Sequence, residues 1–229
     1  MEIKRLWNKW THDVPEGHEY FSGNYHGGDA SYTYVEQDGE RLFDGPFKFY
    51  RQLDQDMYDK ASGHFTMNRK TGDWQFAHRG FRHDLRLDVQ FSNGHIDGEL
   101  SLVDVEDKVS FSLVNAIEMT VNEDKVKGEL SGLINEGDFF GFCDENGFAD
   151  GQWTLTFKKG KKTTTMATEL WEHGVCVKAY EEDYHLHKKN DIAPFMRERL
   201  NMILSEDLPK LLKIVKRGTS WAPVHIKRK

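Results

Sequence analysis

The sequence has few cysteines, no long apolar run and a modest hydrophobic content, and these absences narrow the class of protein. Of 229 residues only 38% are hydrophobic, and Cys143 and Cys176 are the only cysteines. Two cysteines without a CxxC spacing favour free thiols over a disulfide or a metal site. No stretch of about 18 apolar residues is present, so a transmembrane helix is not expected. The start of the chain lacks the apolar core of a signal peptide, and we therefore expect a cytoplasmic protein.

Aromatic residues make up 13% of the sequence, which argues against disorder because disordered chains are poor in Trp, Tyr and Phe. A compact double-layered core usually needs more aliphatic residues than this chain has. A thin sheet with one apolar face needs fewer, and the composition therefore favours a single layer.

The formal net charge of −7 conceals an uneven distribution along the chain. From Tyr184 to the end there are 11 basic and 4 acidic residues, a charge of +7, whereas residues 1–183 carry 20 basic and 34 acidic residues, a charge of −14. An acidic body of this kind is not expected to bind nucleic acid. It favours a basic protein as partner, because opposite charges steer association; the alternative is that the charge serves only solubility.

Five glycines, each just ahead of an alternating aromatic or aliphatic stretch, recur at nearly even spacing. The gaps between them are 27, 26, 30 and 23 residues, and the glycines are Gly45, Gly72, Gly98, Gly128 and Gly151. Such a period is typical of a repeat architecture. A glycine at such a position either permits a bulge that curls the sheet or lets an aromatic ring lie flat across the strand. The alternative is that these glycines only form turns.

Residues from about 30 to 182 alternate apolar and polar side chains, as strands with one buried face do. The clearest case is the run 85–91. Asn93-Gly94 and Asn146-Gly147 supply the positive φ values that two-residue hairpin loops require. Connections this short leave no room for crossover helices. The pattern therefore predicts one antiparallel meander of ten or more strands, with Trp74 and Trp153 buried in equivalent places.

The stretches 92–100 and 144–157 resemble MORN-type repeats, in particular the variant repeats of bacterial antitoxin-like MORN proteins. The resemblance covers 30–182. It implies a single-layered, curved antiparallel sheet with a role in binding or scaffolding, and it supplies no catalytic residues. The fold class expected is thus mainly β, a curved meander of MORN-like hairpin repeats with a C-terminal amphipathic helical segment.

Three regions are expected along the chain. Residues 1–29 are an irregular segment or a degenerate first repeat, in which Trp7 and Trp10 could anchor a short helix or an edge, and 30–189 form the sheet. Residues 190–229 are a helical segment with a basic tail.

The helical segment begins with an expected N-cap at Asn190-Asp191, and its leucines recur at three- and four-residue steps. Pro209 is expected to break it into two helices meeting near 205–208. The tail from Thr219 onward is expected to be extended or mobile. The apolar side of the helices either covers the sheet, which we favour, or lies on an anionic membrane.

Candidate chemical sites are weak. His185 and His187 would share one face of a strand as half a metal site, or be two edge histidines. Asp144, Glu145 and Asp150 crowd one hairpin as an acid–base pair would, or as solvated turn residues do. No nucleophile, phosphate-binding or zinc motif is present, so we expect neither a cofactor nor an enzyme.

Two functional hypotheses follow. In the first, which we favour, the protein is a non-enzymatic protein-binding module, an immunity or antitoxin-like protein that uses the acidic sheet surface. The binding residues expected on the polar side of the strands are Arg86, Asp88, Gln90 and Glu99, since they alternate with apolar residues. In the second, the meander closes into a barrel-like ligand-binding or enzymatic protein with an enclosed cavity.

Overall fold

The computed structural model of the protein describes residues 14–108, 111–134, 137–159, 163–220 and 224–229, and Trp7 and Trp10 lie outside these ranges. The described chain forms one sheet of 14 strands, in which each strand pairs antiparallel with the next in sequence. The predicted meander between 30 and 182 is confirmed. The strands are β1 (Glu19–Tyr25), β2 (Gly28–Gln37), β3 (Glu40–Gln52), β4 (Tyr58–Thr66), β5 (Arg69–Arg79), β6 (His83–Ser92), β7 (His95–Lys108), β8 (Phe111–Asn122), β9 (Lys125–Ile134), β10 (Gly137–Cys143), β11 (Gly151–Lys159), β12 (Thr163–Glu172), β13 (Val175–Asp183) and β14 (Lys188–Asp191).

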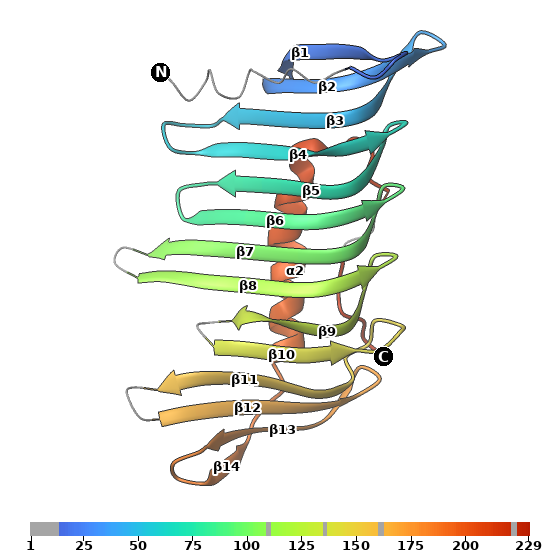
Figure 1. The fold of residues 1–229 in the computed structure, drawn as a ribbon. Coiled ribbons are helices and arrows are strands. Elements are labelled where there is room, and N and C mark those ends of the chain that lie inside the picture. The colour runs from blue at the N-terminus through green and yellow to red at the C-terminus, as the bar shows by residue number, and fades with distance from the viewer. Residues whose placement is uncertain (1–13, 109–110, 135–136, 160–162, 221–223) are drawn as a thin grey trace.

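The sheet is open and elongated. Its strands stack like the rungs of a ladder, with β1 and β14 at opposite ends (Figure 1). Because the terminal strands do not pair, the meander does not close, and the barrel-like arrangement is wrong for the architecture. β1 lies inside the segment 1–29, where it pairs with β2 as the first strand of the array.

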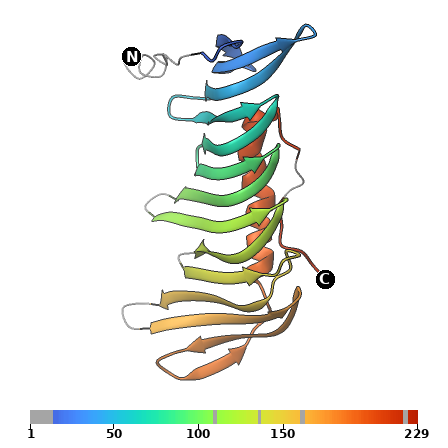
Figure 2. The ribbon, with the colours of Figure 1, turned by 45° about the vertical axis from the view of Figure 1, so that its right-hand side comes forward.

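Four of the five repeat glycines lie in β-bulges. The ladder register shifts opposite Gly45, Gly72, Gly98 and Gly128, which all have positive φ. At Gly98, with φ 123°, an added Cβ would lie 2.1 Å from the side-chain oxygen of Gln90. Of the two roles expected for these glycines, bulge formation is the one observed. Bulges bend a strand, and the strands curve in a common direction near the bulged edge (Figure 2).

The second expected role, packing beneath an aromatic ring, belongs to other glycines. The Trp74 ring lies on Gly63, where an added Cβ would come within 2.2 Å of it, and the Trp153 ring lies on Gly141 at 2.9 Å. Each indole N–H donates to the carbonyl of the residue after that glycine, over 2.9 and 2.8 Å. Both tryptophans are fully buried. Their predicted burial and equivalence are confirmed.

Within the described residues, one α-helix, α2 (Met196–Leu212), crosses the strands on one side of the sheet and continues into the 3-10 turn η1 (Lys213–Val215). It packs against β5 and β6, so the expected cover of the apolar face is confirmed. We call this side of the sheet the inner face and the opposite side the open face. The buried residues of α2 are Met196, Leu200, Ile203, Leu204, Leu208, Leu211 and Leu212.

The predicted break at Pro209 is wrong, since α2 runs through it without interruption. Proline leaves the carbonyl of the residue four positions earlier without its helical donor. That residue, Ser205, is exposed, so water can satisfy its carbonyl. The packing of leucines on both sides of Pro209 keeps the helix whole.

The start of α2 is capped by a side chain from the sheet. The predicted cap at Asn190-Asp191 is wrong because these residues belong to β14. Instead, the fully buried carboxylate of Glu169 on β12 accepts from the backbone N–H groups of Phe195 and Met196. Its second oxygen accepts from the Trp171 indole at 3.0 Å. A carboxylate at this end complements the positive end of the helix dipole.

The other end of the helical segment is held by a second fully buried ionisable side chain, Lys70 on β5. Its ammonium donates to the carbonyls of Val215 and Arg217 at 2.6 and 2.8 Å and to the Thr219 hydroxyl. Burial lowers the pKa of Lys70 to about 7, while the three oxygens and the negative end of the helix favour its charged form. The helical segment thus lies between two buried ionisable side chains, Glu169 at its start and Lys70 at its end.

Replacement of Lys70 by methionine is expected to lower the free energy of unfolding by about 2–3 kcal/mol, because buried carbonyl groups lose their charged donor. Lys213 is exposed at the same helix end, and Lys213→Met is expected to change stability by less than about 0.5 kcal/mol. Urea unfolding of the two variants provides the measurement. Equal midpoints would contradict the capping role of Lys70.

The described part of the C-terminal tail is extended, which is one of the two alternatives expected for it, and it is packed against the rest of the protein. Val224 and Ile226 are fully buried. The Asn201 side chain holds both backbone groups of Ile226, at 2.7 and 3.1 Å. Lys227 donates its backbone N–H to the carbonyl of Gly147 at 2.9 Å. The tail therefore ties α2 to the hairpin turns along the edge of the sheet.

Candidate functional site

The open face of the sheet carries the four residues predicted to bind a partner. Leu85, Leu87 and Val89 of β6 are buried, and alternation then directs Arg86, Asp88 and Gln90 to the opposite side. Glu99 of β7 reaches the same side beside the buried Leu100. The structure brings three of the four predicted residues together.

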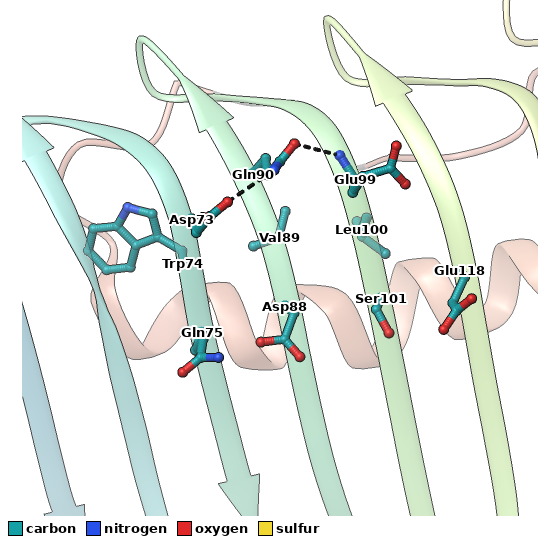
Figure 3. Close-up of a pocket in the computed structure, with 10 residues that line it drawn as sticks. All are labelled: Asp73, Trp74, Gln75, Asp88, Val89, Gln90, Glu99, Leu100, Ser101 and Glu118. Atoms are coloured by element: carbon teal, nitrogen blue, oxygen red, sulfur yellow. Dashed lines mark hydrogen bonds between the residues drawn. The ribbon is translucent and has the colours of Figure 1, made fainter.

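These three residues border a hollow of about 430 Å³ that crosses β5 to β8 (Figure 3). Two rows of side chains run across the strands there. The ladder register aligns the central row, and the outer row lies next to it toward the bulged edge. The central row consists of Gln75, Asp88, Ser101 and Glu118, and the outer row of Asp73, Gln90, Glu99 and Thr120.

Gln90 has a structural task within the outer row. Its side-chain nitrogen donates to Asp73 at 3.0 Å, and its oxygen accepts from the backbone N–H of Glu99 at 3.0 Å (Figure 3). The second contact satisfies a backbone group in the bulge at Gly98, where the ladder is interrupted. The Glu99 carboxylate accepts from the Thr120 hydroxyl at 3.2 Å. The outer row is therefore held in place by its own hydrogen bonds.

Arg86 lies apart from the other three predicted residues. It pairs with Asp84 at 2.9 Å and borders a smaller hollow of about 180 Å³, together with Lys60. Asp88 borders both hollows. The predicted set thus divides between an acidic hollow and a neighbouring one that carries basic side chains.

Exposed carboxylates cross the open face from β5 to β9. Among the described side chains, each strand from β5 to β9 carries an exposed carboxylate. The carboxylates of β5 and β7 lie in the outer row and those of β6 and β8 in the central row. The carboxylate of β9 lies in a bulge beside the outer row, where Lys127 faces Thr120. No hydrogen bond or ion pair joins Asp88 or Glu118 to another described residue. Lys127 on β9 pairs with Glu145 at 3.7 Å. The five carboxylates are Asp73, Asp88, Glu99, Glu118 and Glu129.

Beyond the carboxylates, the same two rows end in aromatic side chains on β10. Phe140 faces Ser131 and Phe142 faces Glu129 across the β9–β10 pair. The two phenylalanines are 43% and 39% exposed, whereas the alternate residues of this strand are buried. Asp138 is exposed on the same side of β10, so the change from acidic to aromatic side chains applies to the two rows and not to the whole open face.

Sequence reasoning missed Asp73, Gln75, Ser101 and Glu118 because it considered each strand alone. The hairpin at Asn93-Gly94 offers a signal for part of this set, since a two-residue turn sets the register of β6 against β7. The bulges change that register within each hairpin. The alignment of rows across four strands is therefore visible only in the folded sheet.

The acidic hairpin between β10 and β11 has a structural role. Burial acts to raise the pKa of Asp144, but hydrogen bonds from the His173 ring and from the backbone N–H groups of Phe148 and Asn146 outweigh it and lower that pKa. Asp150 accepts from the backbone N–H of His173 at 3.1 Å. Asp144 and Asp150 tie this turn to the next hairpin.

The expected strand position of His185 and His187 is wrong. Both lie in the turn between β13 and β14, where the backbone N–H of His185 donates to Asp183 at 2.9 Å. They therefore do not share a strand face. Within the described ranges, no three His, Cys, Asp or Glu side chains come close enough to hold a metal ion.

No protein-family model, curated protein or solved structure matches this chain. Its class is defined by its geometry, which is an open antiparallel meander with one helix across the inner face. No helix in the described part of the chain has the length and apolarity needed to cross a membrane.

Proposed function

We propose that the protein is a non-enzymatic binding module that holds a basic protein partner on its acidic open face. The observation that carries this proposal is the run of exposed carboxylates, one on each strand from β5 to β9. The inner face is occupied by α2. The resemblance to bacterial antitoxin-like MORN proteins leads us to propose an immunity or antitoxin-like role in the bacterial cytoplasm.

The shape and charge of the open face support a macromolecular partner. The larger hollow extends over β5 to β8 (Figure 3), and the smaller one extends over β4 to β6. Asp88 and Glu118 have no partner among the described residues, so their charge is available to a bound cation. Complementary charge raises the association rate and selects the partner more than it adds affinity. The partner surface expected here presents several Lys or Arg residues.

Reversal of two central-row charges, Asp88→Lys with Glu118→Lys, is expected to abolish capture of the partner from a native lysate at low salt. Both side chains are exposed, so the fold should be preserved. In the unaltered protein, capture should weaken as salt rises past about 0.15 M, where the Debye length is about 8 Å. The measurement is a pull-down at two salt concentrations, with thermal melts to verify folding.

The matched control is Glu36→Lys with Glu40→Lys, which reverses two exposed charges on the distant β2–β3 hairpin. It changes the net charge by the same amount and should leave capture intact. If both double variants lost capture of the partner equally, the loss would be explained by the overall net charge and not by the open face. If no protein is retained at low salt and turnover of a small molecule is found instead, the binding-module proposal fails.

A further inference from the structure

The five carboxylates that cross the open face from β5 to β9 form a zigzag, and the spacing between them matches one kind of partner segment better than others. We infer that this face seats a basic α-helix lying across the strands, with lysines or arginines alternately three and four residues apart. This inference rests on the proposed function and specifies its partner. The bound helix would cross the sheet on the open face, as α2 does on the inner face.

The negative charges on the open face are spaced by the strands that carry them. Asp73, Glu99 and Glu129 lie in or beside the outer row on β5, β7 and β9, and Asp88 and Glu118 lie in the central row on β6 and β8. Neighbouring strands are about 4.8 Å apart. Each carboxylate is therefore displaced by about 4.8 Å from the previous one along the sheet and changes row.

An α-helix can present basic side chains at nearly the same spacing. Residues alternately three and four apart lie on one side of an α-helix and zigzag about its axis, advancing by about 5.3 Å per step. Over four steps the helix advances about 21 Å and the carboxylates about 19 Å. Long Lys and Arg side chains cover a mismatch of about 2 Å by changing rotamer.

An extended segment fits this face less well. Its side chains return to one side every second residue, so they advance by about 6.6 Å per step and about 26 Å over four steps. That is about 7 Å out of register with the carboxylates. Its backbone would also find no unpaired strand, because β5 to β9 are bonded on both sides. A helix satisfies its own backbone groups and needs only side-chain contacts.

Aromatic side chains lie beyond the β9 end of the zigzag. Phe140 and Phe142 follow the last carboxylate, in line with the two rows, and both are exposed. Apolar side chains on the partner helix one turn beyond its last basic residue would cover these rings. The face therefore specifies a direction along the partner as well as its charge pattern.

The test uses synthetic peptides of about 20 residues, long enough to reach from β5 to β10 as a helix. The striped peptide carries five lysines alternately three and four apart, followed by two leucines one turn on. The scrambled peptide has the same composition and helicity, with lysines distributed around the helix. Fluorescence anisotropy against the full-length protein is expected to give at least about tenfold tighter binding of the striped peptide.

Variants assign the binding to the zigzag. Asp88→Asn with Glu118→Asn is expected to weaken striped-peptide binding about tenfold, and Glu36→Gln with Glu40→Gln should leave it unchanged. Equal affinities for both peptides would overturn the helix inference and leave the proposed function standing. Absence of peptide binding, with a lysate protein still captured through the open face, would do the same. Absence of both would overturn both proposals.

Discussion

Removal of residues 192–229 is expected to turn the protein into an aggregating chain. The deletion leaves all 14 strands but strips α2 and the tail from the inner face. Trp74, Leu85 and Leu87 are essentially fully buried in the intact chain, and α2 packs on the strands that carry them. Exposed apolar patches above about 600 Å² are rare on monomeric proteins and promote association. Light scattering and size-exclusion chromatography of the truncated chain measure the effect.

A shorter truncation separates the role of the helix from that of the tail. Removal of 224–229 leaves α2 in place but removes the buried Val224 and Ile226 side chains, the hydrogen bonds of the tail to Asn201 and Gly147, and the ion pair of Arg228 with Glu198. That variant should remain dispersed, with a lower unfolding midpoint. If the chain without 192–229 were monomeric and folded while the full-length protein bound anionic liposomes, the helix would serve a membrane, and the covering role would be wrong.

Substitution of Trp153 by alanine is expected to lower the free energy of unfolding by about 3–5 kcal/mol, as deletion of large buried aromatic residues does. Its ring is fully buried on Gly141, with Phe139 and Trp171 at centroid distances of 5.5 and 6.1 Å. The substitution also leaves the Phe142 carbonyl without its indole donor. Trp74→Ala should have a similar effect, because that ring lies in the equivalent position.

Phe142→Ala is the control, because this aromatic residue lies on the adjacent strand but faces the open side. At 39% exposure, its loss is expected to cost less than about 1 kcal/mol. Urea unfolding of the three variants makes the comparison. Unchanged midpoints for both tryptophan variants would show that the repeats do not share a packing unit.

Much of the sheet can be predicted from the sequence, because a hairpin is formed by residues that are close together in the chain. Period-two alternation in 85–91 separates the buried residues from the exposed ones, and the nearby Asn93-Gly94 turn marks the hairpin. The same alternation is sufficient to direct Arg86, Asp88, Gln90 and Glu99 to one side. It does not reveal that Gln90 is engaged in the bulge or that Arg86 lies in a separate hollow, since both depend on neighbouring strands.

The repeat glycines show where this local reasoning reaches its limit. Their spacing predicts a repeated role, and positive φ at Gly98 is a property that glycine tolerates best. Whether such a glycine forms a bulge or supports a ring depends on the facing strand. The rings of Trp74 and Trp153 lie on Gly63 and Gly141, which are outside the periodic set.

By itself, the sequence determines an antiparallel meander with one apolar face and an amphipathic segment at its end, because alternation, turn chemistry and helical periodicity act over a few residues. Only the tertiary structure decides how that segment is held. Glu169 caps a helix start 27 residues away, and Lys70 reaches a carbonyl 145 residues away. No local sequence pattern predicts these contacts. A buried ionisable side chain is stable only where the fold brings hydrogen-bonding groups to it, and here those groups come from distant parts of the chain. Pro209 is likewise decided by the tertiary structure, because packing of the helix against the sheet outweighs the local preference of proline for a helix break.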